Sequence, residues 1–119
     1  MESSSTSSVA SGLLGFPFKG GTHFFHPEQI IRLEAESNYT FIYVREQKPI
    51  IMAKVLANYE TLLAPFGFLR THRSHLINKQ HVLLINEEGR IVMDDQSVAD
   101  LSRRKRKHIL KILSTRQAA

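Results

Sequence analysis

The sequence predicts a mainly β fold, made of small antiparallel sheets of short strands with one internal helix and a C-terminal helix. Three observations lead to this prediction. Short apolar segments recur along the chain, turn residues separate them at close intervals, and only two stretches show helical spacing of their apolar residues. Many short strands with few helices are typical of an antiparallel β domain.

The first half of the chain contains most of the expected strands, at residues 16–19, 22–26, 30–35, 38–46 and 50–53. Gly20 and Gly21 are expected to turn the first hairpin. Both faces of strand 38–46 are largely apolar, so we expect a central strand. Its aromatic face is expected in the core, because the chain has no tryptophan and few other large side chains; this face carries Tyr39, Phe41 and Tyr43.

The internal helix is expected from Val55 to Leu63, where apolar residues recur at helical spacing before Pro65 and Gly67 end the pattern. Further strands are expected at residues 81–86, 90–93 and 97–101. Ser102 is the expected amino-terminal cap of the closing helix. The apolar side of that helix is expected to consist of Ile109, Leu110, Ile112 and Leu113.

Length and composition limit the domain organisation. A chain of 119 residues suffices for one domain, and we expect a disordered serine-rich leader at residues 1–12 followed by one folded domain at 13–119. The chain has no cysteine, which excludes disulfides and thiol chemistry and fits a cytoplasmic location. It also has no apolar run long enough to span a membrane and no positively charged start of a secretory signal.

The segment FLRTHRSHLIN, residues 68–78, interrupts a strand pattern with a basic and hydroxyl cluster. Arg70, His72, Arg73, Ser74 and His75 require water or a polar partner, whereas the flanking residues are apolar. Arginine beside serine suits phosphate oxygens and guanine edges. A hydrated strand end or turn is the alternative interpretation of this cluster.

The positive charge of the chain is concentrated at its carboxyl end. Residues 101–119 contain seven basic residues and no acidic one, whereas the first hundred residues contain nine basic and eleven acidic residues, a net charge of −2. Such a concentration is typical of a surface that binds a polyanion. A solubilising tail and a membrane-surface patch remain as alternatives.

The order of these features resembles the LytTR DNA-binding domain of bacterial LytR/AlgR-type transcriptional regulators. The matching segments are IIRLEAESNYTFIYV, VLANYETLLAPF, FLRTHRSHLINKQHV and LSRRKRK, and the resemblance extends over about residues 16–113. It implies a mostly β fold that reads double-stranded DNA with turns and strand ends. This would explain why a basic chain has no helix-turn-helix signature.

The resemblance implies three places of contact with DNA. The first is Ser37, Asn38 and Tyr39; the second is Arg73 with Ser74; the third is Arg103, with Arg104 and Lys105 on backbone phosphates. Asn38 can pair with adenine and Arg103 with guanine. Two of these residues have structural alternatives, because asparagine tolerates the left-handed region of a turn and Tyr39 shares a face with Phe41. The resemblance also implies that His72 is a structural hydrogen-bonding residue.

An enzyme is not expected. His23 and His26 are three residues apart, as are His72 and His75, and residues at this spacing on a strand point to opposite faces. Neither pair therefore converges on a metal ion without a turn. Glu34 and Glu36 would share a strand face, where solvated charges explain them. We accordingly expect no catalytic residue, cofactor or metal.

Two partner hypotheses remain beside duplex DNA. The same basic surface suits RNA or an acidic protein, and the face of Tyr39, Phe41 and Tyr43 could stack on bases if it were exposed. Only a serine-rich leader precedes the matching segments, so we expect no receiver domain and no control by phosphorylation of one. Control would then depend on abundance, a second copy on repeated sites, or a separate regulatory protein that docks near Asn58, Glu60 and Thr61.

Overall fold

A computed structural model describes residues 12–114. The strands are β2 (Leu14–Phe18), β3 (Gly21–Phe25), β4 (Ile30–Glu36), β5 (Tyr39–Val44), β6 (Ile50–Met52), β7 (Phe68–His72), β8 (His75–Asn78), β9 (Val82–Ile85), β10 (Ile91–Met93) and β11 (Val98–Ala99). The α-helices are α1 (Leu56–Leu63) and α2 (Arg106–Leu113), with short 3₁₀ turns at Pro27–Gln29, Ala64–Phe66, Lys79–His81 and Arg103–Lys105. The leader expected at residues 1–12 lies, apart from Gly12, outside the described residues.

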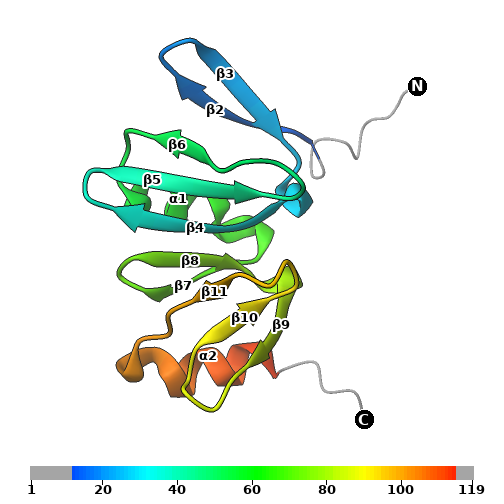
Figure 1. Ribbon diagram of the computed structural model, residues 1–119, viewed down its shortest axis with the longest axis vertical. Helices are drawn as coiled ribbons and strands as arrows, with labels where there is room; N and C mark the ends of the chain where they lie inside the picture. The colour runs from blue at the N-terminus through cyan, green and yellow to red at the C-terminus, as the bar shows by residue number, and fades with distance from the viewer. Residues whose placement is uncertain (1–11, 115–119) are drawn as a thin grey trace.

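Ten strands form three antiparallel units among the described residues. The largest is a five-stranded sheet in the order β6-β5-β4-β8-β7, and the others are the sheet β11-β10-β9 and the hairpin β2-β3. Figure 1 shows the hairpin at one end of the molecule, the five-stranded sheet in the middle, and the small sheet with α2 at the other end. The predicted antiparallel β fold is therefore confirmed.

Two apolar clusters hold these units together. One lies between the five-stranded sheet, α1 and the hairpin, and includes Phe16, Leu33 and Leu63. The other joins β4 and β8 to the small sheet, and includes Ile77 and Met93. Alternate residues of β4 and β8 therefore face different clusters, which explains why both strands are apolar on two faces.

The expected burial of the aromatic face of β5 is wrong. The core receives Thr40, Ile42 and Val44, whereas Tyr39 on the opposite face is 50% exposed. Phe41 and Tyr43 are half-buried. The small sheet covers the β8 side of that face and leaves the β5 side partly open, so alternation alone could not decide which face packs on α1.

Several local expectations need correction. Phe18 pairs with Gly21, so the first hairpin turns at Lys19–Gly20, and Gly21 begins the return strand with a φ of +152° that glycine tolerates. Ser102 provides no side-chain cap, because its extended backbone leads into a 3₁₀ turn before α2. Leu110 is 38% exposed, since α2 buries only Ile109 fully.

Within residues 12–114, no helix has the length and apolar character needed to cross a membrane.

Candidate nucleic-acid interface

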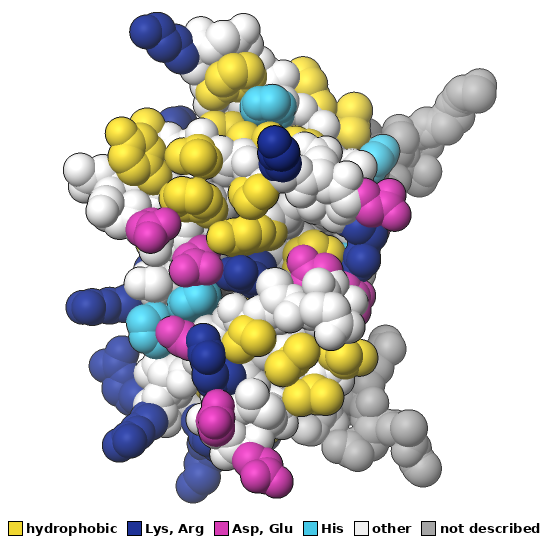
Figure 2. Space-filling view, in the orientation of Figure 1, with side chains coloured by type: hydrophobic (Ala, Val, Ile, Leu, Met, Phe, Trp, Pro, Cys, Tyr) yellow, Lys and Arg dark blue, Asp and Glu magenta, His cyan; other side chains and the backbone are white. Residues whose placement is uncertain are grey.

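The three segments with candidate DNA-binding residues lie along one edge of the molecule. The β4–β5 turn, the β7–β8 turn and the 3₁₀ turn Arg103–Lys105 all face the left side of Figure 1. In Figure 2, Lys and Arg side chains gather along the lower part of this same margin. Segments that are far apart in the sequence therefore form one continuous surface.

The β4–β5 turn presents the first candidate residues. Glu36 pairs with Tyr39, which leaves Ser37 and Asn38 as a two-residue turn. All three candidates, Ser37, Asn38 and Tyr39, are exposed. The alternative interpretation of Asn38 was that it occupies the left-handed position of the turn. Ser37 occupies that position instead, with a φ of 56°. A non-glycine residue in this region is strained by about 1 kcal/mol, and its neighbours must hold it there.

The β7–β8 turn presents the second pair. His72 pairs with His75 across the turn, so Arg73 and Ser74 are at its corner and the Arg73 side chain is exposed. The Ser74 amide donates to His72 Nδ1 at 3.0 Å, which confirms the structural role expected for His72. The Ala35 amide donates to Ser74 O at 2.9 Å and thereby joins this turn to β4, close to the first turn.

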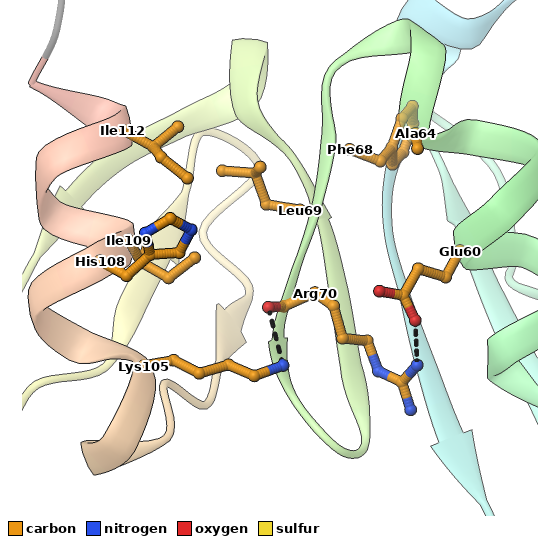
Figure 3. Close-up of a pocket in the computed structure, with 9 residues that line it drawn as sticks. All are labelled: Glu60, Ala64, Phe68, Leu69, Arg70, Lys105, His108, Ile109 and Ile112. Atoms are coloured by element: carbon orange, nitrogen blue, oxygen red, sulfur yellow. Dashed lines mark hydrogen bonds and ion pairs between the residues drawn. The ribbon is translucent and has the colours of Figure 1, made fainter.

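Arg70 holds the β7–β8 turn from inside. Its Nε donates to His72 O at 3.0 Å, and its Nη2 donates to Arg73 O at 2.6 Å. Its Nη1 forms an ion pair with Glu60 Oε1 of α1 at 2.6 Å (Figure 3). Arg70 is therefore not the free cation that the sequence pattern suggested, and its function as an anchor of the turn was missed because Glu60 belongs to a different element.

The 3₁₀ turn Arg103–Lys105 presents the third group and is joined to β7 just before the second turn. The Ser102 amide donates to Thr71 O at 2.8 Å, and Thr71 Oγ1 donates to Asp100 O at 2.8 Å. Lys105 Nζ reaches Arg70 O at 3.3 Å, across a cleft of about 300 Å³ between α1, β7 and α2 (Figure 3). Arg103 and Arg104 point into solvent as exposed side chains.

A buried histidine lies behind these turns. His75 is 6% exposed, and its Nε2 is 3.6 Å from Asp100 Oδ2. Burial lowers the pKa of His75 and outweighs the opposing effect of Glu34 and Asp100. Its ring centroid is 5.5 Å from that of His72, so the turn does bring these two histidines together. Even so, no group of three potential ligand side chains suited to a metal ion is found within residues 12–114.

Of the two acidic residues of β4 that were expected to be solvated, Glu36 is exposed, whereas Glu34 is paired. Glu34 Oε1 accepts from Arg32 Nη1 at 2.8 Å, and the Arg32 side chain is only 7% exposed. The Arg32 guanidinium also stacks over the Tyr43 ring at 4.1 Å from its centroid. These contacts assign Glu34 to a structural ion pair, and they cover one of the three aromatic rings of this sheet face.

Comparison with known proteins relates this geometry to a family. The family model of the LytTr DNA-binding domain matches residues 20–114. Among solved structures, the chain is similar to the LytTr DNA-binding domain of a Bacillus cereus protein described as a methyl-accepting/DNA response regulator, with a TM-score of 0.69 at 20% identity. This alignment covers 87% of this chain and 97% of that chain. The comparison with curated proteins found no significant match.

Proposed function

Because the match over residues 20–114 shows that the chain belongs to the LytTR DNA-binding domain family, we propose that it is a transcriptional regulator that binds double-stranded DNA sequence-specifically. The observation that carries this proposal is the position of three turns on one edge, two of which present exposed arginines. A duplex needs basic side chains for its phosphates and fork-shaped donors for its base edges. The cytoplasm is the compartment that suits this activity.

The three turns suit different tasks. Arg103 is proposed to read guanine, because its side chain is exposed at the start of the basic segment and no hydrogen bond from residues 12–114 occupies its fork. Arg104 and Lys105 are proposed to hold backbone phosphates, and the 3.3 Å contact of Lys105 Nζ to Arg70 O leaves two of its three N–H groups available. Their position beside β7 links phosphate binding to the second turn.

The first two turns complete the proposed interface. Asn38 is proposed to pair with adenine and Tyr39 to reach a phosphate or sugar, since both side chains are exposed on the β4–β5 turn. Arg73 is proposed to contact phosphate or guanine, with Ser74 beside it. Ser37 contributes its hydroxyl and its strained backbone, which directs the turn outward.

RNA is the second candidate partner, and the half-open aromatic face of β5 is the observation that favours it. Tyr39 is 50% exposed and could stack on a base. Tyr43, however, is covered by Arg32 at 4.1 Å, and Phe41 is half-buried. A platform with one half-exposed ring is small for single-stranded RNA, so duplex DNA is the better-supported ligand.

Control of the regulator is proposed to involve a second copy on repeated sites or a separate protein. The exposed side of α1 was expected to dock such a protein through Asn58, Glu60 and Thr61. Glu60 is engaged with Arg70, so this surface is reduced to Asn58 and Thr61, which are exposed.

Duplex binding is expected to be strongly salt-dependent. If about five phosphates are neutralised, a plot of log affinity against log salt concentration should have a slope near −4.5. Fluorescence anisotropy with a duplex selected from a random pool measures this slope. Single-stranded RNA of equal length is the competitor, and it should displace the duplex poorly. An affinity that does not change with salt, or better competition by RNA, would contradict the proposal.

Arg103 and Lys107 are expected to contribute differently to binding. Arg103→Ala should cost about 1–3 kcal/mol on the preferred site and relax the preference at one or two base pairs, because its fork reads a base edge. Lys107→Ala is the matched control: it removes an exposed charge four residues further along the chain, in α2, and should weaken all duplexes about equally. Affinities for a set of single-base variants of the site distinguish the two. Equal effects of both substitutions would show that Arg103 does not read bases.

A further inference from the structure

A groove continues the candidate interface beyond its first turn. It has a volume of about 380 Å³ and lies between the tip of the β2–β3 hairpin and the paired strands β5 and β6. Its walls include Phe18 and Lys19 from the hairpin, Tyr39 from β5, Ile51 from β6, and Lys54. Tyr39 therefore belongs both to this groove and to the proposed DNA-binding surface.

The groove combines apolar walls with positive charge. Phe18, Tyr39 and Ile51 are 43%, 50% and 57% exposed. Lys19 and Lys54 are exposed, and none of the lining residues is acidic. Apolar side chains between two cations match the chemistry of a nucleic-acid backbone, in which sugars offer apolar surface and phosphates alternate with them. A single exposed lysine without such apolar neighbours would not indicate a binding site.

The position of the groove favours the same duplex as the occupant. Thr40 Oγ1 donates to Lys54 O at 2.6 Å and holds Lys54 beside the start of β5. In Figure 1, the hairpin turn lies on the same side as the β4–β5 turn, the β7–β8 turn and the start of the closing helix. The groove is therefore continuous with the proposed interface on the side away from α2.

The length of this edge fits a duplex. The longest dimension of the molecule is 43 Å, and it runs vertically in Figure 1 from the hairpin to α2. A duplex rises about 3.4 Å per base pair, so about 12 to 13 base pairs span the edge. A duplex that contacts Arg103 at one end and Tyr39 further along would pass the hairpin tip if it continued in the same direction.

We propose that the groove between Lys19 and Lys54 binds the sugar–phosphate backbone of the regulated duplex, on the flank of the base-reading turns. This inference rests on the proposed function, because it requires that the three turns bind DNA. It adds the β2–β3 hairpin as a fourth element that contacts DNA. Residues 17–19 of this hairpin precede residues 20–114, the part of the chain that the family model matches. Binding in the groove should raise the affinity and lengthen the DNA footprint. It should not change the sequence preference, since phosphate contacts carry no sequence information.

The test is a comparison of variants on duplexes of different length. Combining Lys19→Ala with Lys54→Ala should lower affinity for a long duplex about tenfold and reduce the magnitude of the salt slope by about 1.8, because two phosphate contacts are lost. On a duplex shortened by five base pairs on the hairpin side, the double variant and the unmodified chain should bind equally. Both ends are shortened separately, and the hairpin side is the end whose removal abolishes the difference in affinity between the double variant and the unmodified chain.

Lys48→Ala is the control, because it removes an exposed charge from the loop between β5 and β6, which lies on the right side of Figure 1, at the opposite end of these strands from the β4–β5 turn. It should leave the affinity within twofold of the unmodified chain. If the double variant behaves like Lys48→Ala, or loses as much affinity on the shortened duplex, the groove does not bind DNA although the proposed function stands. Absence of any duplex binding by the unmodified chain would overturn both. Melting curves of all variants should coincide, since each lysine is exposed.

Discussion

Replacing Asn78 with alanine is expected to lower the free energy of unfolding by about 3 kcal/mol, the largest loss of stability expected from a single polar group in this domain. Asn78 is 1% exposed. Its Nδ2 donates to Ile30 O at 2.9 Å and Pro27 O at 3.2 Å, and its Oδ1 accepts from the Gln80 amide at 3.0 Å. Alanine would leave Ile30 O and the Gln80 amide without the Asn78 side chain as a partner, and Pro27 O with the bond from the Ile30 amide alone, at a site where Asn78 itself is almost fully buried.

Asn86→Ala is the matched control for this prediction. Asn86 Oδ1 accepts from the Glu88 and Arg90 amides, both at 3.0 Å, in an exposed turn where water can replace the lost acceptor. Its cost should therefore remain below about 1 kcal/mol. Urea unfolding followed by circular dichroism measures both, provided that the slope of each transition is unchanged. Equal midpoints for the two variants would show that Asn78 is not a buried anchor.

Asn78 belongs to a sequence motif that contains both buried anchors and exposed residues. Residues 68–78 were interpreted as a polar cluster that meets a ligand, yet Arg70, His75 and Asn78 turn inward. Two of their partners, Glu60 for Arg70 and Ile30 for Asn78, are ten and forty-eight residues away in the sequence. Only the packed sheet brings these groups together, so local pattern could not separate the anchors from the exposed Arg73.

The order of strands and helices could be predicted because it depends on local signals. Alternation identified β5, helical spacing identified α1, and Gly67 adopts the positive φ, 88°, at which that helical segment ends. The buried face of β5 could not be predicted in the same way. Both of its faces are apolar, and the choice depends on α1 packing against Ile42 while the small sheet covers Tyr43 only partly.

The residues of the candidate site could be predicted from the sequence, whereas the contacts that hold them in place could not. The resemblance selected residues on three turns, and the structure brings those turns to one edge. Their hydrogen bonds to one another, such as Ala35 N to Ser74 O and Ser102 N to Thr71 O, involve backbone atoms that any side chain would allow. Sequence patterns contain little information about such contacts, whereas the fold determines them.

Arg70→Gln is expected to weaken binding to the preferred duplex about tenfold and to lower the free energy of unfolding by about 1–3 kcal/mol. Arginine can donate to His72 O, Arg73 O and Glu60 at once because its fork is planar and rigid. Glutamine cannot span all three acceptors, so the β7–β8 turn should lose its fixed geometry. Arg45→Gln is the control, since it removes a 2.7 Å ion pair to Asp94 from an exposed site and should change stability by about 0–1 kcal/mol.

A double-mutant cycle determines whether Arg70 acts through Arg73. If Arg70 only positions the turn, adding Arg70→Gln to Arg73→Ala should cost little further affinity, because the side chain that it positions is already absent. If Arg70 contacts DNA itself, the two losses should add, and the salt slope should fall once for each substitution. Anisotropy titrations are made below the melting temperature of the least stable variant, so that unfolding does not imitate lost binding. We expect the non-additive result, because all three donating nitrogens of Arg70 are already bound within the protein.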